Sequence, residues 1–370
     1  MKIASFNIQN LFHRDKSLLV KFMGKNITDW TEELDHLMKH GEKGPNDYDR
    51  IRELSFLLGF ERNITQNFGV LRRRNGELYL KQGSVLHQPK AAEHTLWQGW
   101  MPIHTTPISK KAVQHKAMVI AQANPDILLL QEVEDKASLN IFLKDHLSQH
   151  DILPYAQCQV LEGYDSRGLA FGVALKEGYR LEGVKSYGHF LDRTGRPIFQ
   201  RDCQEYRILT PRNEWLTILC VQFSNTNPKR RKLQSQTVAN IYGELRSSGY
   251  ERIVVCGTFY EPSFSDGLRP LFSTADLKDI SKHQGFKVTM DTKEGANYYR
   301  LGAYRKGVNL KQRDYLLYNE PLAKHVMGGG MNRRGIWPSR SSKWPIFSSL
   351  KRRSDAASEH PLLWMELSPA

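Results

Sequence analysis

The chain has 370 residues, a formal net charge of +14 from 53 Lys and Arg against 39 Asp and Glu, and 40% hydrophobic residues. This share of apolar residues is enough for a packed core and excludes a disordered or fibrous chain. No apolar run approaches the roughly 18 residues of a membrane span, and the first residues lack the hydrophobic stretch of a signal peptide. We therefore expect a cytoplasmic protein without a transmembrane segment.

The positive surplus favours polyanionic partners, namely nucleic acid, another phosphodiester polyanion or an anionic lipid surface. The alternative is ordinary background composition. Basic residues gather at positions 72–74, 229–232, 333–334 and 351–353. Aromatic residues lie near the later of these groups in the sequence, and Arg beside planar rings suits single strands or flipped bases. Each basic group taken alone is usually a solvated face.

The four cysteines are Cys158, Cys203, Cys220 and Cys256, and no two of them form a CxxC pair. This spacing favours free thiols in a reducing compartment over a zinc site or a disulfide framework. Cys220 and Cys256 stand inside apolar runs, so we expect them to pack in the core.

The pattern of apolar residues predicts a strand at residues 2–8, followed by a less regular segment with a helix at 49–58 and a short strand at 77–81. A helix is expected at 109–123, a strand buried on both faces at 127–131, and a helix at 138–147. Further strands are predicted at 168–175, 205–210, 215–223, 252–258, 315–318 and 362–367, with a helix at 231–245 that begins with basic residues. Strands outnumber helices, which favours an α+β or layered sandwich over strict βαβ alternation.

Polar residues at strand ends are the candidates for chemistry. Asn7 lies in the first strand, and Glu132 directly follows the apolar run 127–131. A carboxylate at the end of a buried strand is costly unless it is paired or coordinated. Oxygen ligands of this kind suit Mg²⁺ or Mn²⁺ better than zinc. The alternative is that Glu132 only caps the next loop.

Asp314 and His360 each precede a predicted strand, and Glu359 stands beside the histidine. A histidine with nearby carboxylates can orient and polarise a transferring phosphoryl group. The alternative is a hydrogen-bonded structural histidine.

Four segments in this order carry a resemblance: residues 3–12 (IASFNIQNLF), 125–133 (PDILLLQEV), 313–317 (RDYLL) and 358–360 (SEH). Together they resemble the endonuclease/exonuclease/phosphatase superfamily, whose fold is DNase I-like. Residues 165–168, 201–203 and 328–335 resemble a bacterial subgroup of it. The resemblance extends from residue 1 to about 367. It implies a single domain over residues 1–370, with a family-specific insertion at about 14–108. The implied fold is a four-layered α/β sandwich of two central, mostly antiparallel sheets flanked by helices.

The resemblance also implies a metal-dependent hydrolase, a phosphodiesterase or nuclease that uses Mg²⁺ or Mn²⁺. Asn7 and Glu132 would lie on the metal side with Glu359, which stands where the family has Asp. Asp314 would orient a catalytic His360. Arg167, in the segment 165–168, would bind substrate together with Gln222, Thr258 and Tyr260.

Two motifs depart from the family. Its Gly-Asp-Phe-Asn reads Gly257-Thr258-Phe259-Tyr260 here, and the histidine of its Asn-His-Phe-like strand is replaced by Gln222. Thr258 has no carboxylate and cannot act as a base near neutral pH, and Gln222 carries no positive charge. Losing a positioned base removes about 10²–10⁴ in rate, and losing one electrostatic donor removes about 10²–10³.

Two functional interpretations follow from these departures. The first is a nuclease-like phosphoesterase with an eroded active site, weak or altered hydrolysis, and a metal that is either retained or lost. The alternative is a non-catalytic pseudoenzyme that binds nucleic acid or phosphate as a subunit of a larger assembly, with a protein partner.

Overall fold

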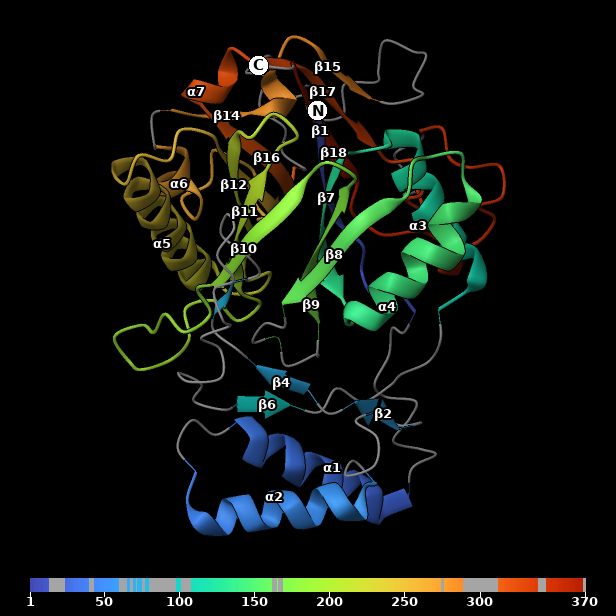
Figure 1. Ribbon diagram of the computed structural model, residues 1–370, viewed down its shortest axis with the longest axis vertical. Coiled ribbons are helices and arrows are strands. Elements are labelled where there is room, and N and C mark those ends of the chain that lie inside the picture. The colour runs from blue at the N-terminus through green and yellow to red at the C-terminus, as the bar shows by residue number, and fades with distance from the viewer. Residues whose placement is uncertain are drawn as a thin grey trace.

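The computed structural model describes residues 1–12, 24–39, 43–59, 65–66, 69–70, 72–74, 77–79, 98–100, 108–161, 165, 169–273, 276–288, 312–338 and 344–368. Two seven-stranded sheets pack face to face and helices cover their outer faces (Figure 1). Most neighbouring strands in both sheets run antiparallel. The sandwich of two central sheets flanked by helices that the sequence predicted is confirmed.

The first sheet has the strand order β15-β17-β18-β1-β7-β9-β8 and the second has the order β14-β16-β13-β12-β11-β10-β5. The strands of the first sheet are β15 (Phe286–Val288), β17 (Val326–Asn332), β18 (Leu362–Leu367), β1 (Lys2–Asn7), β7 (Ile127–Val133), β9 (Ala170–Lys176) and β8 (Tyr155–Leu161). Those of the second are β14 (Leu277–Asp279), β16 (Asp314–Asn319), β13 (Ile253–Thr258), β12 (Trp215–Gln222), β11 (Cys203–Leu209), β10 (Arg180–Ser186) and β5 (Glu77–Tyr79).

The central strand β7 shows why the apolar runs form this sandwich. Ile127 and Leu129 pack into the core between the two sheets, whereas Leu128 and Leu130 pack on the outer side with Ile120 of α3 (Lys110–Ala123). A strand covered on both faces needs apolar residues at successive positions, as the run 127–131 predicted. On the second sheet, α5 (Pro228–Ser247) and the short α6 (Arg269–Phe272) cover the outer face.

The predicted helices are present, with ends set by their caps. Ser109 accepts a hydrogen bond from the Lys111 N–H (3.2 Å), and Asn124 ends α3 in the left-handed conformation. The helix expected at 231–245 begins earlier, at Pro228, because Asn227 caps the Arg230 N–H (3.0 Å). The helix expected at 138–147 begins as α4 (Lys136–Ile141) and continues as a π-helical turn, Phe142–His146. No helix in the described ranges is both long and apolar enough to cross a membrane.

The long segment after β1 forms structure mostly outside the sandwich. Its helices α1 (Gly24–Lys39), which the sequence analysis missed, and α2 (Pro45–Leu57) share a small core of Leu34, Met38, Leu54 and Leu58. Figure 1 shows this pair beyond the end of the sheets at which β1 leaves the sandwich. The short strands are β2 (Thr65–Gln66), β3 (Gly69–Val70), β4 (Arg72–Arg74) and β6 (Gln98–Trp100), and α7 (Glu320–Ala323) follows β16. Among the short strands described in this segment, β5 joins a large sheet by pairing with β10.

All four cysteines are free, and Cys220 and Cys256 are buried between the sheets. The sequence-based expectation of free thiols, with these two in the core, is confirmed.

The glycines of β17 generate a prediction about stability. A methyl group at Gly329 would lie 2.7 Å from the Trp364 carbonyl oxygen and would collide with Ile280. Because Trp364 is held in β18 by ladder hydrogen bonds, we expect Gly329→Ala to lower the free energy of unfolding by about 1–3 kcal/mol. Gly243 lies exposed in α5 with open space around it, so Gly243→Ala serves as the control and should raise stability by up to about 1 kcal/mol. Urea unfolding of both variants measures the difference, and equal effects would contradict this packing.

Candidate active site

One end of the sandwich collects polar residues from both sheets. Parallel strands β1 and β7 end there, and so do parallel strands β12 and β13. Strand β16 runs antiparallel to β13 and strand β18 runs antiparallel to β1, so both begin at that end. The residues brought together in this way are Asn7, Glu132, Gln222, Thr258, Asp314 and His360. We call the hydrogen bonds among these residues the inter-sheet network.

The first branch of the inter-sheet network is centred on Thr258. The Thr258 hydroxyl accepts a hydrogen bond from Asn7 Nδ2 (3.2 Å) and donates one to Asp314 Oδ1 (2.7 Å). The Asp314 carboxylate in turn accepts from His360 Nδ1, at 2.9 and 3.0 Å from its two oxygens. All four side chains are buried. The branch thus runs from the first sheet through two residues of the second and back to the first.

The second branch of the inter-sheet network joins Glu132 to Gln222. Glu132 Oε1 accepts a hydrogen bond from Gln222 Nε2 (2.6 Å), which also donates to the Tyr260 hydroxyl (2.8 Å). That hydroxyl also accepts from Arg201 Nη1 (2.7 Å), and the Arg201 guanidinium lies 5.5 Å from the centre of the Tyr260 ring. The Tyr260 ring meets His360 edge to face at 6.1 Å, which brings the two branches into contact.

Uncommon backbone conformations aim several of these side chains. Glu132 and Tyr260 have φ angles of 64° and 63°, a left-handed conformation that is rare for large side chains. Glu132 stands at a β-bulge between β7 and β9, which redirects a side chain at a strand end. Such strain costs about 1–3 kcal/mol per residue and is concentrated at functional sites.

The loop after β1 is shaped in a similar way. Gln9 and Asn10 both have positive φ, and the Gln9 N–H donates to Asn7 Oδ1 (3.2 Å). The Gln9 side chain accepts a hydrogen bond from the Glu359 N–H (2.7 Å). This loop therefore orients Asn7 and contacts the segment that carries His360.

The charges at the site favour a protonated His360. Burial lowers the pKa of this imidazole, but the charge and hydrogen bond of Asp314, together with the charge of Glu132, outweigh it and raise the pKa above its ordinary value. The nearby, exposed Arg313 opposes that rise. Burial, reinforced by Glu132, also raises the pKa of Tyr260, which stays a neutral hydroxyl.

Seven of the nine site residues named from the sequence lie in this assembly. Glu359 lies apart from it: the side chain is exposed and forms an ion pair with Arg353 (2.8 Å). Arg167 lies outside the described residues.

Two further residues support the site and were given no role from the sequence. Arg201, in the segment 201–203, precedes the fully buried Asp202, whose carboxylate accepts hydrogen bonds from Ser186 (2.8 Å) and Gln204 (2.9 Å). Because Asp202 is anchored, its neighbour Arg201 is held at the site. The signal in the sequence was a charged pair shortly before the predicted strand 205–210.

Lys116 is the second supporting residue. It is fully buried in α3 and its ammonium group donates to the carbonyl oxygens of Ile8 (2.8 Å) and Ala357. These carbonyls lie one residue after Asn7 and three residues before His360, so Lys116 ties together the two segments that carry them. A lysine among the apolar positions of the predicted helix 109–123 was the available signal.

The donor set fits a magnesium-type cation. Glu132 supplies one carboxylate and Asn7 one amide oxygen from adjacent strand ends. Mg²⁺ is commonly bound by one or two carboxylates, with water and substrate phosphate completing its shell. Within the described residues, no group of three or more His, Cys, Asp or Glu side chains is arranged to hold a metal ion.

No protein-family model and no curated protein matches the sequence. Similar solved structures include a mannosyl-6-phosphatase from Bacteroides thetaiotaomicron, with 12% identity over 70% of this chain and 90% of that chain, at a TM-score of 0.47. They also include Caenorhabditis elegans TDP2, with 15% identity over 70% and 90%, at 0.46, and the human Nocturnin catalytic domain, with 14% over 70% and 87%, at 0.45. Two further similar structures, from Bacteroides thetaiotaomicron and Bacteroides vulgatus, are described as endonuclease/exonuclease/phosphatase proteins. The likeness is one of fold.

The raised pKa of His360 predicts a pH-dependent stability. Folding favours the protonated form, so this stabilisation is fully present below about 6.5, the pKa of an unfolded histidine, and is lost as pH rises through the higher folded pKa. We expect the stability difference between the wild type and His360→Gln to shrink as the pH rises above about 6.5 in urea unfolding. Asp314→Asn should lower the His360 pKa in an NMR titration. A difference that grows with pH would contradict this assignment.

Proposed function

We propose that this protein binds phosphate esters at the candidate active site and hydrolyses them slowly with a divalent cation, with nucleic acid as the substrate class. The observation that carries the proposal is the buried Asp314–His360 pair at the end of both sheets. Because the pKa of His360 is raised, its imidazolium form is favoured and can stabilise negative charge on a phosphoryl oxygen. His360 uses Nδ1 for Asp314, which leaves Nε2 to face a ligand.

Asn7 and Glu132 would hold the cation, which when bound polarises the phosphoryl group and lowers the pKa of a coordinated water. Gln222 and Arg201 both donate to the Tyr260 hydroxyl and so keep it beside His360. In this arrangement the side chains bind and orient the ester.

Slow hydrolysis follows from Thr258. Its hydroxyl already donates to Asp314 and accepts from Asn7, and a hydroxyl is no base near neutral pH. The carboxylates of Asp314 and Glu132 are engaged with His360 and Gln222. Without a positioned base, hydrolysis loses about 10²–10⁴ in rate.

Because the polar groups of the site already have hydrogen-bond partners, a second candidate function is also favoured. A site whose buried polar groups already satisfy one another is stable without turning over a substrate. In this alternative the chain is a phosphate- or nucleic-acid-binding pseudoenzyme within a larger assembly. Turnover separates the two functions.

The basic surface supports a polyanionic ligand, although fewer residues contribute than the sequence suggested. Lys351, Arg352 and Arg353 are exposed, and Arg353 pairs with the residue next to His360. The two arginines at 333–334 instead lie over aromatic rings of the core edge. The exposed basic group nearest in sequence to His360 is therefore 351–353.

Residues 229–232, one of the basic groups of the sequence, do not form a single exposed surface. Arg231 is buried, where it forms an ion pair with Glu261 and donates to the Ser224 carbonyl. Arg230 donates to the Pro197 carbonyl (2.6 Å). Two lysines of this group remain exposed, because helix packing turns the arginines inward.

The first test of the proposal is turnover. With Mg²⁺ or Mn²⁺, we expect the wild type to cleave short DNA, RNA and bis(4-nitrophenyl) phosphate slowly. Glu132→Gln should reduce the rate at least about tenfold, since it removes the only carboxylate proposed to hold the cation. The triple change Gln222→His, Thr258→Asp, Tyr260→Asn should raise it by about 10² or more.

Lys324→Ala, an exposed change beyond the far end of β16, is the control and should leave the rate unchanged. Circular dichroism checks that each variant is folded. A folded wild type and a folded triple variant that both bind phosphate without turnover would contradict hydrolysis and leave the pseudoenzyme.

The second test is the salt dependence of nucleic-acid binding. Each phosphate neutralised on a single strand contributes about −0.7 to the slope of log affinity against log salt. Removing two contacts with the double change Lys351→Ala, Arg352→Ala should therefore make the slope shallower by about 1.4. The matched control is Lys324→Ala with Arg212→Ala, both exposed at the other end of the sheets. Equal slopes for the two double variants would remove residues 351–353 from the binding surface.

A further inference from the structure

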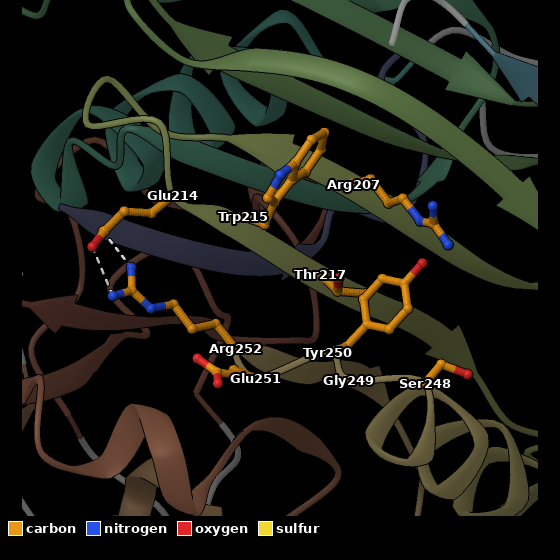
Figure 2. Close-up of a pocket in the computed structure, with 9 residues that line it drawn as sticks. All are labelled: Arg207, Glu214, Trp215, Thr217, Ser248, Gly249, Tyr250, Glu251 and Arg252. Atoms are coloured by element: carbon orange, nitrogen blue, oxygen red, sulfur yellow. Dashed lines mark hydrogen bonds and ion pairs between the residues drawn. The ribbon is translucent and has the colours of Figure 1, made fainter. Parts of the chain in front are cut away.

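A pocket lies at the opposite end of the second sheet from the candidate active site. It has a volume of about 560 Å³ and is formed by β11, β12, the turn between them and the loop from α5 to β13 (Figure 2). Trp215 begins β12 and Gln222 ends it. The seven steps from Trp215 to Gln222, at about 3.3 Å per residue, place the pocket about 23 Å from the inter-sheet network. The two sites share no residue.

Two aromatic side chains form the walls of this pocket. Trp215 is 49% exposed, although it begins a strand whose other residues are all buried. Tyr250, in the loop after α5, lies 4.7 Å from the Arg207 guanidinium, measured to its ring centre. Figure 2 shows Trp215, Arg207 and Tyr250 arranged around Thr217. Thr217 stands opposite Arg207 in the pairing of β12 with β11.

Arg207 is positioned but not saturated. Its Nε donates to Glu205 Oε1 (2.9 Å), and its planar group stacks on Tyr250. In the described part of the chain, its two terminal nitrogens have no hydrogen-bond partner. A guanidinium held in this way presents two parallel N–H donors with little loss of side-chain freedom on binding.

The charges of the pocket are balanced. Arg252 forms a two-nitrogen ion pair with Glu214, in which one bond measures 2.7 Å, and this pair joins the β11–β12 turn to the start of β13. Among the residues that line the pocket, Arg207 and Glu251 bring one further charge of each sign, so the lining balances, and Glu205 pairs with Arg207 from outside the lining. With no positive surplus, the pocket does not favour a phosphate group, and its selectivity rests on a planar face and hydrogen-bond acceptors.

We propose that this pocket binds a purine base, guanine in preference to adenine, stacked on Trp215 and hydrogen-bonded by Arg207. The volume is within the range of small-ligand sites. Guanine offers two acceptors, O6 and N7, to the paired N–H groups of an arginine, whereas adenine places an N–H₂ donor at one of these positions. Pyrimidines offer a smaller face for stacking.

The test uses the full chain and guanosine, with GMP, adenosine and uridine as comparison ligands, in calorimetric titrations. We expect guanosine to bind at least about fivefold more tightly than adenosine. GMP should bind within about twofold of guanosine, because the charges of the lining balance. Trp215→Ala should weaken guanosine binding at least about fivefold through lost stacking.

Two further variants separate geometry from charge. Arg207→Lys keeps the charge but loses the planar pair of donors, so it should weaken guanosine binding as much as Arg207→Gln does. Trp337→Ala removes another exposed tryptophan and is the matched control, expected to bind as the wild type does. His360→Gln should leave guanosine affinity unchanged, so failure of the active-site proposal and failure of this one are distinguishable.

Two outcomes would overturn the proposal: no saturable binding of guanosine at millimolar concentration, or equal affinity for uridine. Unchanged affinity in both folded Trp215→Ala and Arg207→Lys would place guanosine elsewhere on the molecule and would also overturn it.

Discussion

The hydrogen bond from Thr258 to Asp314, with the bond that Thr258 accepts from Asn7, is the constraint on which the site depends. Asn7 belongs to the first sheet and the other two residues to the second, so this hydroxyl joins the sheets at one end. Buried polar groups are costly unless they are hydrogen-bonded. In this chain of bonds, each partner comes either from the opposite sheet or from the neighbouring strand of the same sheet. The sheets must therefore end at the same level. That common level also brings Gln222 to Glu132 and places His360 against Asp314.

Much of this arrangement was accessible from the sequence, because strand ends are local features. The apolar run 127–131 predicted a buried strand and put Glu132 at its end, and the order of the segments predicted which residues would meet. Other features depend on contacts between distant segments. The inward turn of Arg231 requires Glu261 and Ser224, and Arg201 reaches Tyr260 only once β11 lies beside β12. Helix α1 packs on α2 rather than on the main core, so neighbouring strands gave no signal for it.

The replacement of a carboxylate by Thr258 changes the balance between stability and chemistry. A hydroxyl donates and accepts at once, so it satisfies both Asp314 and Asn7 without adding charge. A carboxylate at this position would stand beside Asp314, and two such groups do not both ionise without a compensating cation. With Thr258, the inter-sheet network is therefore stable without a bound metal. With a carboxylate at this position, the stability of the network would depend on a bound metal. The proposal of ligand binding with slow turnover rests on this property.

The two ends of β12 differ in their electrostatic environment. At Gln222, the strand ends in the network that contains a histidine whose protonation is favoured, and Arg353 of the exposed basic group 351–353 pairs with the residue next to that histidine. At Trp215, each arginine of the pocket has a carboxylate partner. Long-range attraction of a polyanion depends on unbalanced charge, whereas recognition of a base depends on a planar surface and fixed donors. A nucleic acid that reached both ends would thus be attracted through its backbone at one and distinguished through its bases at the other. The rigid strand between them sets the distance that such a ligand has to span.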